Sequence, residues 1–227
     1  MKYKTILFDA DGTLLDFARA EASALSDTLA HVSLPDDEET HRVYSAANAE
    51  QWALLEQKRV TRAELRYNRF HNFCKALGFS RDANEMADFY ENALAHKGFL
   101  IDGALELCRT LSKSCDLYII TNGFVKIQTG RFADSPITPY FKRIFISEEI
   151  GVEKPDVGFF DYVAREIPDF DKSATLVVGD SLASDIEGGI RAGLATCWIN
   201  AGQKPIPTNK PITHVISSLS ELYQIIL

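Results

Sequence analysis

The chain has 227 residues, enough for one well-packed core and a smaller second lobe. Hydrophobic residues make up 46% of it and charged residues 25%, as is usual for a water-soluble protein, and the net charge of −8 argues against binding to a nucleic acid polymer. The few apolar residues before Asp9 are too short a run for a signal peptide or a membrane span, so we expect a cytoplasmic protein that does not contact membranes. The four cysteines form no CxxC pair and are expected to be free packing thiols.

The first expected element is a short buried strand, residues 6–8, which stops at two carboxylates, Asp9 and Asp11. Gly12 and Thr13 form the turn that leaves the strand. Two like charges about 4 Å apart repel by ~4 kcal/mol at an effective dielectric of 20, so a half-buried pair requires a cation, a proton or a chemical role. Taken alone, the pair is explained equally well by a strand followed by a polar turn, because DxDG occurs in many loops and in calcium-binding segments.

A polar, helix-favouring segment without a convincing strand follows, from residue 16 to about residue 97. Helices are expected over residues 19–30, 37–56, 61–77 and 82–95. Thr61 and Glu64 match a capping box, Gly78 ends the third helix, and Asp82 caps the fourth. This segment is therefore predicted to be a helical lobe of about eighty residues.

Beyond residue 100, helices alternate with short apolar strands. Strands are expected at residues 117–121, 143–146, 175–178, 195–199 and 213–216, and helices at 104–112, 157–166, 185–192 and 219–226. Such alternation predicts an α/β fold with an open, mostly parallel sheet covered by helices on both faces. Because the helical lobe separates the first strand from the others, we expect a discontinuous α/β domain, residues 1–15 and 98–227, with residues 16–97 inserted as a helical domain.

Polar residues stand at the carboxyl ends of four expected strands, where open parallel sheets bind ligands. Besides Asp9 and Asp11 these residues are Thr121, Asn122, Lys154, Asp180 and Asp185. Each has a plain structural explanation when taken alone, such as a solvated loop charge or a helix cap. Together they suit phosphoryl transfer, with carboxylate oxygens for Mg²⁺ and with a hydroxyl and an ammonium for the phosphoryl oxygens. No GxxxxGK[ST] loop is present to bind a nucleoside triphosphate.

The motifs FDADGT, IITNG, GVEKPD and VVGDSLASD, in this order, resemble those of the haloacid dehalogenase superfamily. The resemblance implies a Rossmann-like core with a mobile cap domain inserted after the first strand, and Mg²⁺ as cofactor. It implies that Asp9 is the nucleophile that forms an aspartyl-phosphate and that Asp11 is the general acid and base. An aspartate two residues after the nucleophile marks phosphatases and phosphomutases rather than dehalogenases in this superfamily.

The same resemblance implies roles for the remaining residues. Thr121, Asn122 and Lys154 would bind phosphate. Asp180 and the backbone carbonyl of Asp11 would join Asp9 as metal ligands. Asp185 would orient metal-bound water or Lys154 from a second layer.

Longer strings, TNGF, FISEEIGVEKPD and SDIEGGIRAGLATCWIN, resemble the bacterial pyrimidine 5′-nucleotidases of the superfamily. The expected activity is therefore hydrolysis of a small phosphate monoester, a nucleoside 5′-monophosphate, by a monomer or homodimer. N-acylneuraminate-9-phosphatases share part of these strings, so a sugar-phosphate phosphatase remains an alternative. A phosphomutase, which would use the same four motifs on a phosphosugar, is another. A phospho-accepting signalling module, a different class, would be about half this length and would need no cap.

Substrate choice would lie in the inserted lobe, whose aromatic residues could stack on a base. These residues are Phe17, Trp52, Tyr67, Phe70 and Phe73. Aromatic residues at helical spacing more often pack a lobe's own core, and Trp52 and Phe17 are the two candidates kept for the substrate. Arg62 and Arg66, one turn apart, could reach a base or sugar or could simply be solvated.

Overall fold

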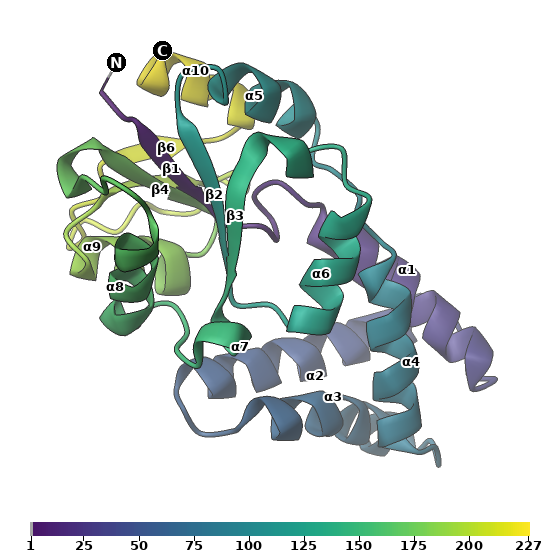
Figure 1. Ribbon diagram of the computed structural model, residues 1–227. Coiled ribbons are helices and arrows are strands. Elements are labelled where there is room, and N and C mark those ends of the chain that lie inside the picture. Colours follow the sequence, from purple (N-terminus) through teal and green to yellow (C-terminus); the bar gives the residue numbers. More distant parts are fainter. Residues whose placement is uncertain (1) are drawn as a thin grey trace. The chain divides into compact units, whose positions relative to one another are not determined.

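A computed structural model describes residues 2–227 of the chain (Figure 1). The chain divides into two compact units. The first, which we call the core unit, contains the residues up to Phe17 together with Gly98–Leu227; the second, the helical unit, is Ala18–Lys97.

The core unit is built on one six-stranded sheet whose strands are all parallel. Its strands are β1 (Thr5–Phe8), β2 (Asp116–Thr121), β3 (Phe141–Ile146), β4 (Thr175–Gly179), β5 (Ala195–Ile199) and β6 (His214–Ile216). They lie in the order β3-β2-β1-β4-β5-β6, so that the chain builds outward from β1 in one direction and then from β4 in the other. The predicted fold class is confirmed, and every predicted strand is present within two residues of its expected bounds.

Helices cover both faces of this sheet because side chains alternate along each strand. Ile6 and Phe8 of β1 pack in one apolar cluster with α5 (Ala104–Leu111) and α10 (Leu222–Ile226). Leu7, between them, points to the opposite face and packs in a cluster with α8 (Val157–Glu166). Figure 1 shows α8 and α9 (Glu187–Arg191) on one side of the sheet and α5 and α10 on the other. The four cysteines are free and buried, as predicted.

Several short elements of the core unit differ from the expectation. Two helices were not predicted, α6 (Val125–Ala133) and α7 (Ser147–Ile150). The expected helix over residues 185–192 is a π-helical turn, Leu182–Ile186, that continues into α9. Single 3₁₀ turns occupy Thr138–Tyr140, Lys172–Ala174 and Leu219–Glu221, the last of which begins the helix expected at residues 219–226.

The helical unit contains α1 (Phe17–His31, whose first residue falls in the core unit), α2 (Glu38–Glu56), α3 (Arg62–Leu77) and α4 (Ala83–Ala95). The predicted capping box is confirmed, since the Glu64 amide donates to Thr61 Oγ1 at 3.2 Å and the Thr61 amide donates to Glu64 Oε2 at 2.8 Å. Gly78 ends α3 in the left-handed region with φ of 69°. Among the described residues, no helix has the length and apolar character needed to cross a bilayer.

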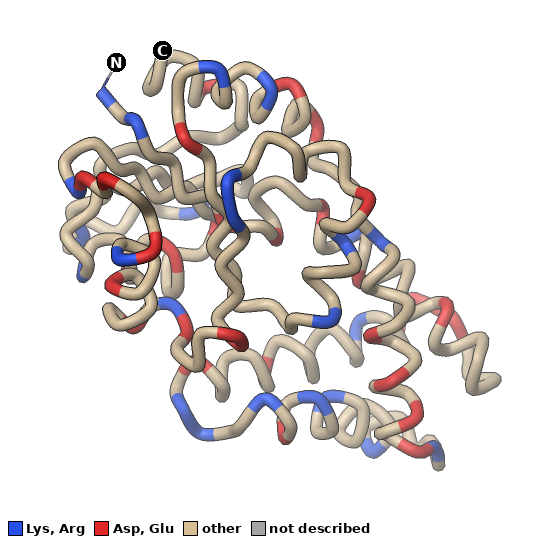
Figure 2. The backbone as a smooth tube through the Cα atoms, in the orientation of Figure 1, with Lys and Arg blue, Asp and Glu red and all other residues tan. Residues whose placement is uncertain are grey.

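Two of the five aromatic residues predicted for the lobe pack its interior. Phe70 and Phe73 are fully buried against Tyr44, and Phe70 also contacts Tyr90. Tyr67 is 38% exposed, and Trp52 is half-buried. Arg66 donates to Glu91 Oε1 at 2.9 Å and pairs with Asp88, so it serves the unit's own packing. Figure 2 shows basic residues at the turn between α2 and α3, interspersed elsewhere with acidic ones.

Candidate active site

Three carboxylates meet at the carboxyl edge of the sheet, where the strand order reverses between β1 and β4. Asp9 directly follows β1, and its amide donates to the Val178 carbonyl at 2.8 Å, which extends the pairing with β4. Asp180 directly follows β4, and Asp185 lies in the π-helical turn after it. Each of Asp9, Asp180 and Asp185 offers a carboxylate oxygen within 4.8 Å of the others'. A strand-order reversal is where open α/β sheets bind their ligands.

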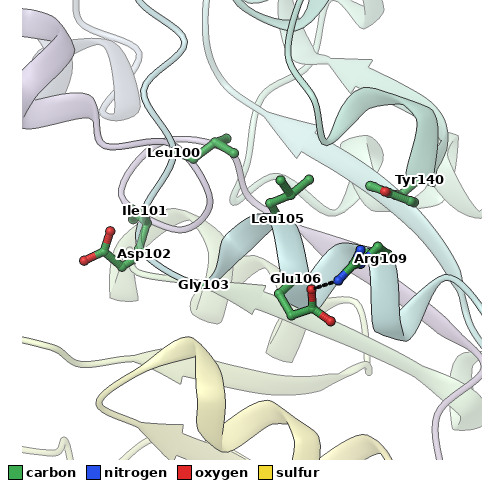
Figure 3. A pocket seen from close by; sticks show the side chains of 8 residues that line it. All are labelled: Leu100, Ile101, Asp102, Gly103, Leu105, Glu106, Arg109 and Tyr140. Carbon is green, nitrogen blue, oxygen red and sulfur yellow. Dashed lines mark hydrogen bonds and ion pairs between the residues drawn. The ribbon is translucent and has the colours of Figure 1, made fainter.

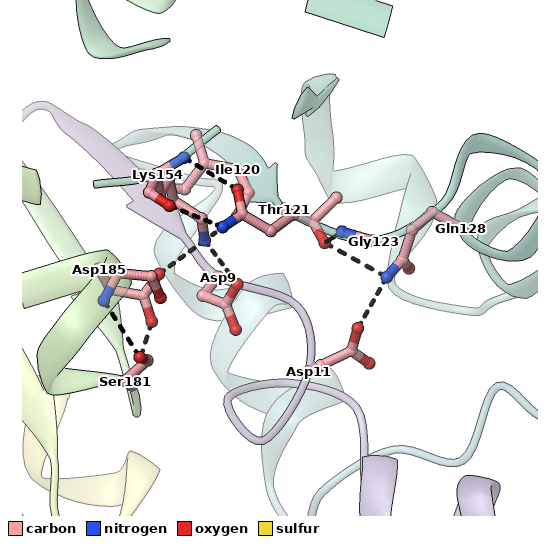
Figure 4. A network of polar contacts seen from close by, with 11 residues as sticks. Asp9, Asp11, Ile120, Thr121, Gly123, Gln128, Lys154, Ser181 and Asp185 are labelled. Carbon is pink, nitrogen blue, oxygen red and sulfur yellow. Dashed lines mark hydrogen bonds and ion pairs between the residues drawn. The ribbon is translucent and has the colours of Figure 1, made fainter. Parts of the chain in front are cut away.

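Lys154 links this cluster from the segment between α7 and α8 (Figure 4). Its buried ammonium donates to Asp9 Oδ1 at 2.7 Å, to Asp185 Oδ1 at 2.6 Å and to the Ile120 carbonyl at 2.8 Å. These three bonds use all three donors of the ammonium. Lys154 therefore fixes the orientation of both carboxylates and supplies positive charge beside Asp9.

Electrostatics in the cluster are dominated by burial and by crowding of like charges. Burial, followed by the charge of Asp185, raises the pKa of Asp9, and the ammonium of Lys154 only partly opposes this. Burial and Asp185 likewise raise the pKa of Asp180, to about 6. Burial alone would lower the pKa of Lys154, but Asp185 and Asp9 raise it above its usual range. The cluster contains three carboxyl groups and one ammonium, so its full ionisation leaves an excess of negative charge.

The donor set fits a divalent cation such as Mg²⁺, which prefers hard oxygen ligands. The excess negative charge of the cluster is what such an ion would offset. Gly12, with φ of 77°, brings the turn after β1 against Asp180; a Cβ at this position would lie 2.5 Å from Asp180 Oδ2. Both oxygens of Asp185 already accept hydrogen bonds, from Lys154 Nζ and from the Ser181 amide at 3.2 Å. Asp9 and Asp180 are therefore better placed as direct ligands than Asp185.

Replacing Asp180 with asparagine is expected to stabilise the metal-free protein. Its pKa in the fold, about 6 against an ordinary 3.8, means that metal-free stability falls as pH rises through about 6. The Asp180 carboxyl is crowded by its neighbours but is still reached by solvent, so screening reduces the gain to about 1 kcal/mol, a rise in Tm of roughly 2–4 °C.

Thermal unfolding with chelator should show this gain for Asp180→Asn at pH 8 and its loss near pH 3, below the ordinary pKa of 3.8, where the carboxyl is mostly neutral in both folded and unfolded chains. Added Mg²⁺ should raise the Tm of the wild type more than that of the variant. Asp102→Asn, at an exposed position of the core unit, is the matched control and should behave as wild type. A lower Tm for metal-free Asp180→Asn would contradict the proposed charge repulsion.

The side chains of Thr121 and Asn122, at the end of β2, have different hydrogen-bond partners. The Asn122 side chain braces the backbone of Lys154: its Nδ2 donates to the Lys154 carbonyl at 2.9 Å and its Oδ1 accepts from the Lys154 amide at 3.0 Å. Thr121 Oγ1 accepts from the Gly123 amide at 3.0 Å. Phosphate binding by these two residues stays a prediction.

Asp11 lies apart from the carboxylate cluster and contacts two residues of α6 that were not predicted from the sequence. Gln128 Nε2 donates to Asp11 Oδ2 at 2.7 Å, and Arg131 Nη1 donates to Asp11 Oδ1. Arg131 is buried, with 2% of its surface exposed. The signal that could have identified them is the spacing of Gln128 and Arg131, three residues apart and thus on one side of a helix that follows a strand end.

A separate hollow of about 420 Å³ opens elsewhere on the core unit, beside the start of α5 (Figure 3). Its lining residues are Leu100, Ile101, Asp102, Gly103, Leu105, Glu106, Arg109 and Tyr140. None of the predicted site residues is among them. Glu106 and Arg109 pair with each other, so this hollow offers no cluster of groups comparable to the one at the strand ends.

The chain is similar in sequence to known hydrolases. A family model for haloacid dehalogenase-like hydrolases matches residues 3–193. The pyrimidine 5′-nucleotidase PynA of Streptococcus pneumoniae is 38% identical over 98% of this chain and 94% of its own length. The pyrimidine 5′-nucleotidase YjjG of Escherichia coli is 34% identical over 100% of this chain and 99% of its own length.

Among solved structures, that of the HAD hydrolase YfnB from Bacillus subtilis superposes with a TM-score of 0.95 at 40% identity. The match covers 100% of this chain and 99% of that one. The YfnB crystal is described as bound to magnesium and as revealing interdomain movement.

Proposed function

Since the chain belongs to the haloacid dehalogenase-like hydrolase family, we propose that it is a magnesium-dependent phosphatase of pyrimidine nucleoside 5′-monophosphates. The observation that carries the proposal is the meeting of Asp9 with Lys154, at 2.7 Å, and with the carboxylates of Asp180 and Asp185 at one sheet edge. Asp11, two residues after Asp9, supplies the second carboxyl that phosphate-ester hydrolysis requires. The nucleotide substrate is supported by the two nucleotidases that resemble nearly the whole chain.

The proposed reaction has two steps. In the first, a carboxylate oxygen of Asp9 attacks phosphorus, the bond between phosphorus and the ester oxygen breaks, and that oxygen leaves as an alcohol with the proton of the Asp11 carboxyl. In the second, a water oxygen attacks phosphorus while Asp11 takes a proton from that water. The bond between phosphorus and Asp9 then breaks, inorganic phosphate leaves, and both side chains return to their starting states.

Other residues of the cluster would hold the reacting groups. Lys154, which donates to Asp9, would place positive charge beside the phosphoryl group, and the Thr121 hydroxyl would donate to a phosphoryl oxygen. Asp9, Asp180 and the Asp11 carbonyl would bind Mg²⁺, with Asp185 orienting the cluster from behind. When bound, the ion supplies positive charge that offsets that of the carboxylates and the phosphoryl oxygens.

We propose that residues 16–97 act as a cap domain that selects the substrate and excludes water from the reaction. Support comes from YfnB, whose structure is described as revealing interdomain movement. Phe70 and Phe73 are committed to the packing of the helical unit, so Trp52, which is half-buried, is the better candidate for contact with a base. Phe17, at the start of α1, is the other candidate. Free, buried cysteines agree with a cytoplasmic enzyme.

The test is a screen for release of inorganic phosphate from nucleoside 5′-monophosphates and sugar phosphates, in Mg²⁺ and in excess chelator. We expect pyrimidine nucleoside monophosphates to be hydrolysed fastest and chelator to stop the reaction. Preference for an acylneuraminate phosphate would favour the sugar-phosphate alternative, and an isomerised sugar phosphate without release would favour a phosphomutase. Activity that persists without metal would contradict the magnesium site, and phosphate retained on the protein without turnover would favour the signalling module.

A further inference from the structure

Two side chains of α6, Arg131 and Gln128, hold both oxygens of the Asp11 carboxyl (Figure 4 shows the Gln128 contact). Arg131 donates to Oδ1, and Gln128 donates to Oδ2 at 2.7 Å. Arg131 is buried, whereas the Asp11 side chain retains 27% of its exposure. The carboxyl is therefore held from the protein side while part of it faces solvent, where a substrate can reach it.

Gln128 also determines which hydrogen bonds the Thr121 hydroxyl accepts and so leaves its proton free to donate. Its Nε2 donates to Thr121 Oγ1 at 3.2 Å as well as to Asp11, and the Gly123 amide donates to the same hydroxyl at 3.0 Å. With both lone pairs of the hydroxyl accepting, its proton is left to donate elsewhere. The reverse orientation of the Gln128 amide would set its carbonyl oxygen against the Asp11 carboxylate, so the network itself fixes the amide.

Gly123 makes room for this bridge. A Cβ at residue 123 would lie 2.3 Å from Gln128 Nε2 and 2.7 Å from its Cγ, so a side chain at this position would displace Gln128. The strand end, the glycine after it and the first turns of α6 thus form one arrangement that joins Thr121 to Asp11.

A gain in folding stability does not by itself explain why Arg131 is buried in an ion pair with Asp11. Burying an arginine and a carboxylate removes two charges from water, and apolar side chains of similar volume often give equal or higher stability. The Arg131 guanidinium also lies 5.9 Å from the centroid of the Phe17 ring, within the range of a cation–π contact. The ion pair between Arg131 and Asp11 therefore holds the Asp11 carboxyl in one direction, and the free-energy cost is the removal of both charges from water.

We propose that Arg131 and Gln128 are positioning residues that aim Asp11 at the leaving oxygen of the substrate, and that Gln128 directs the Thr121 hydroxyl toward the phosphoryl group. This inference rests on the proposed function, because it assigns Asp11 the role of acid and base. It extends that function to two residues outside the four motifs that carry the family resemblance.

The test compares substrates whose leaving groups differ in their need for a proton. Uridine 5′-monophosphate releases a strongly basic alkoxide unless an acid protonates it, whereas p-nitrophenyl phosphate releases a weakly basic phenolate. We expect Arg131→Met to lower kcat/KM for uridine 5′-monophosphate by about 10²- to 10³-fold and that for p-nitrophenyl phosphate by less than about 5-fold. Arg131→Lys should recover part of the loss. Gln128→Met, which removes the amide without adding charge, should show the same selectivity and also raise KM for both substrates.

Phe132→Leu is the matched control, since Phe132 is the next residue of α6 and is buried in the apolar core. It should lower stability without changing the ratio of the two kcat/KM values. In a double-mutant cycle, Arg131→Met added to Asp11→Asn should cause no further loss, because Arg131 acts through Asp11. If Arg131→Met does not fold, Gln128→Met carries the same comparison.

Equal losses on both substrates, or additive effects in the cycle, would show that Arg131 is merely structural and would overturn the inference. A wild-type protein that hydrolyses neither substrate would overturn the proposed function and with it the roles of both residues. These failures are distinguishable, because the first leaves the wild type fully active.

Discussion

Asp9→Asn is expected to reduce turnover by a factor on the order of 10⁵ or more while leaving the fold intact. An amide oxygen is too weak a nucleophile to form the acyl-phosphate bond, so the first step fails. The fold should survive because Asp9 is a buried carboxylate whose raised pKa reports an unfavourable charge, and because Lys154 keeps Asp185 and the Ile120 carbonyl as partners. The loss therefore reflects chemistry rather than unfolding.

Steady-state phosphate release and thermal unfolding, measured on the same preparation, check this prediction. Asp102→Asn, the same chemical change at an exposed position, should keep full activity. Acid quenching during turnover should trap phosphate on the wild-type chain and none on Asp9→Asn. Turnover within about tenfold of the wild type would exclude Asp9 as the nucleophile.

The strands were predictable because each is a short, largely apolar run that either ends in a polar or glycine residue or is directly followed by a polar one. Parallel pairing then brings their carboxyl ends to one edge, so the proximity of Asp9, Asp180 and Asp185 follows from the alternation of helices and strands. What the alternation could not supply is the order of the strands, which decides that β1 and β4 are neighbours. That order places Asp9 beside Asp180.

Helix α6 was not predicted because its buried side carries polar residues, and the same residues contact Asp11. It begins after Phe124, which makes no side-chain cap, and carries Gly130 in its interior. Its buried side includes Gln128 and Arg131, polar residues that interrupt the apolar period by which a helix is recognised in a sequence. Polar residues buried on a helix are satisfied by partners elsewhere in the chain, which a local pattern cannot reveal.

Asn122 makes a contact that no motif predicts. Phosphate binding by Asn122 stays a prediction, and its side-chain amide pairs with the backbone of Lys154, thirty-two residues along the chain. A pairing of this kind depends on how the segment between α7 and α8 folds back across the end of β2. Spacing within the sequence carries no information on that contact.

Asp11→Asn is expected to slow both steps, but to different extents with different substrates. With a nucleoside monophosphate the leaving alkoxide needs the Asp11 proton, so kcat/KM should fall by about 10²- to 10⁴-fold. With p-nitrophenyl phosphate the first step should proceed, while attack by water, which needs Asp11 as a base, becomes limiting. Rapid mixing should then show a burst of nitrophenol equal to the enzyme concentration, followed by slow turnover, with phosphate trapped on Asp9.

The absence of a burst together with an unchanged steady-state rate would rule out Asp11 as the acid and base. A burst that also appears in Asp102→Asn would mean that the second step already limits the wild type, and the size of the change in steady-state rate would then decide the assignment. The amide that Asp11→Asn introduces retains an oxygen that can accept from Arg131, so the loop after β1 should stay in place. The difference between the effects of Asp11→Asn on the two substrates therefore reports the loss of proton transfer, separately from the positioning of the loop by α6.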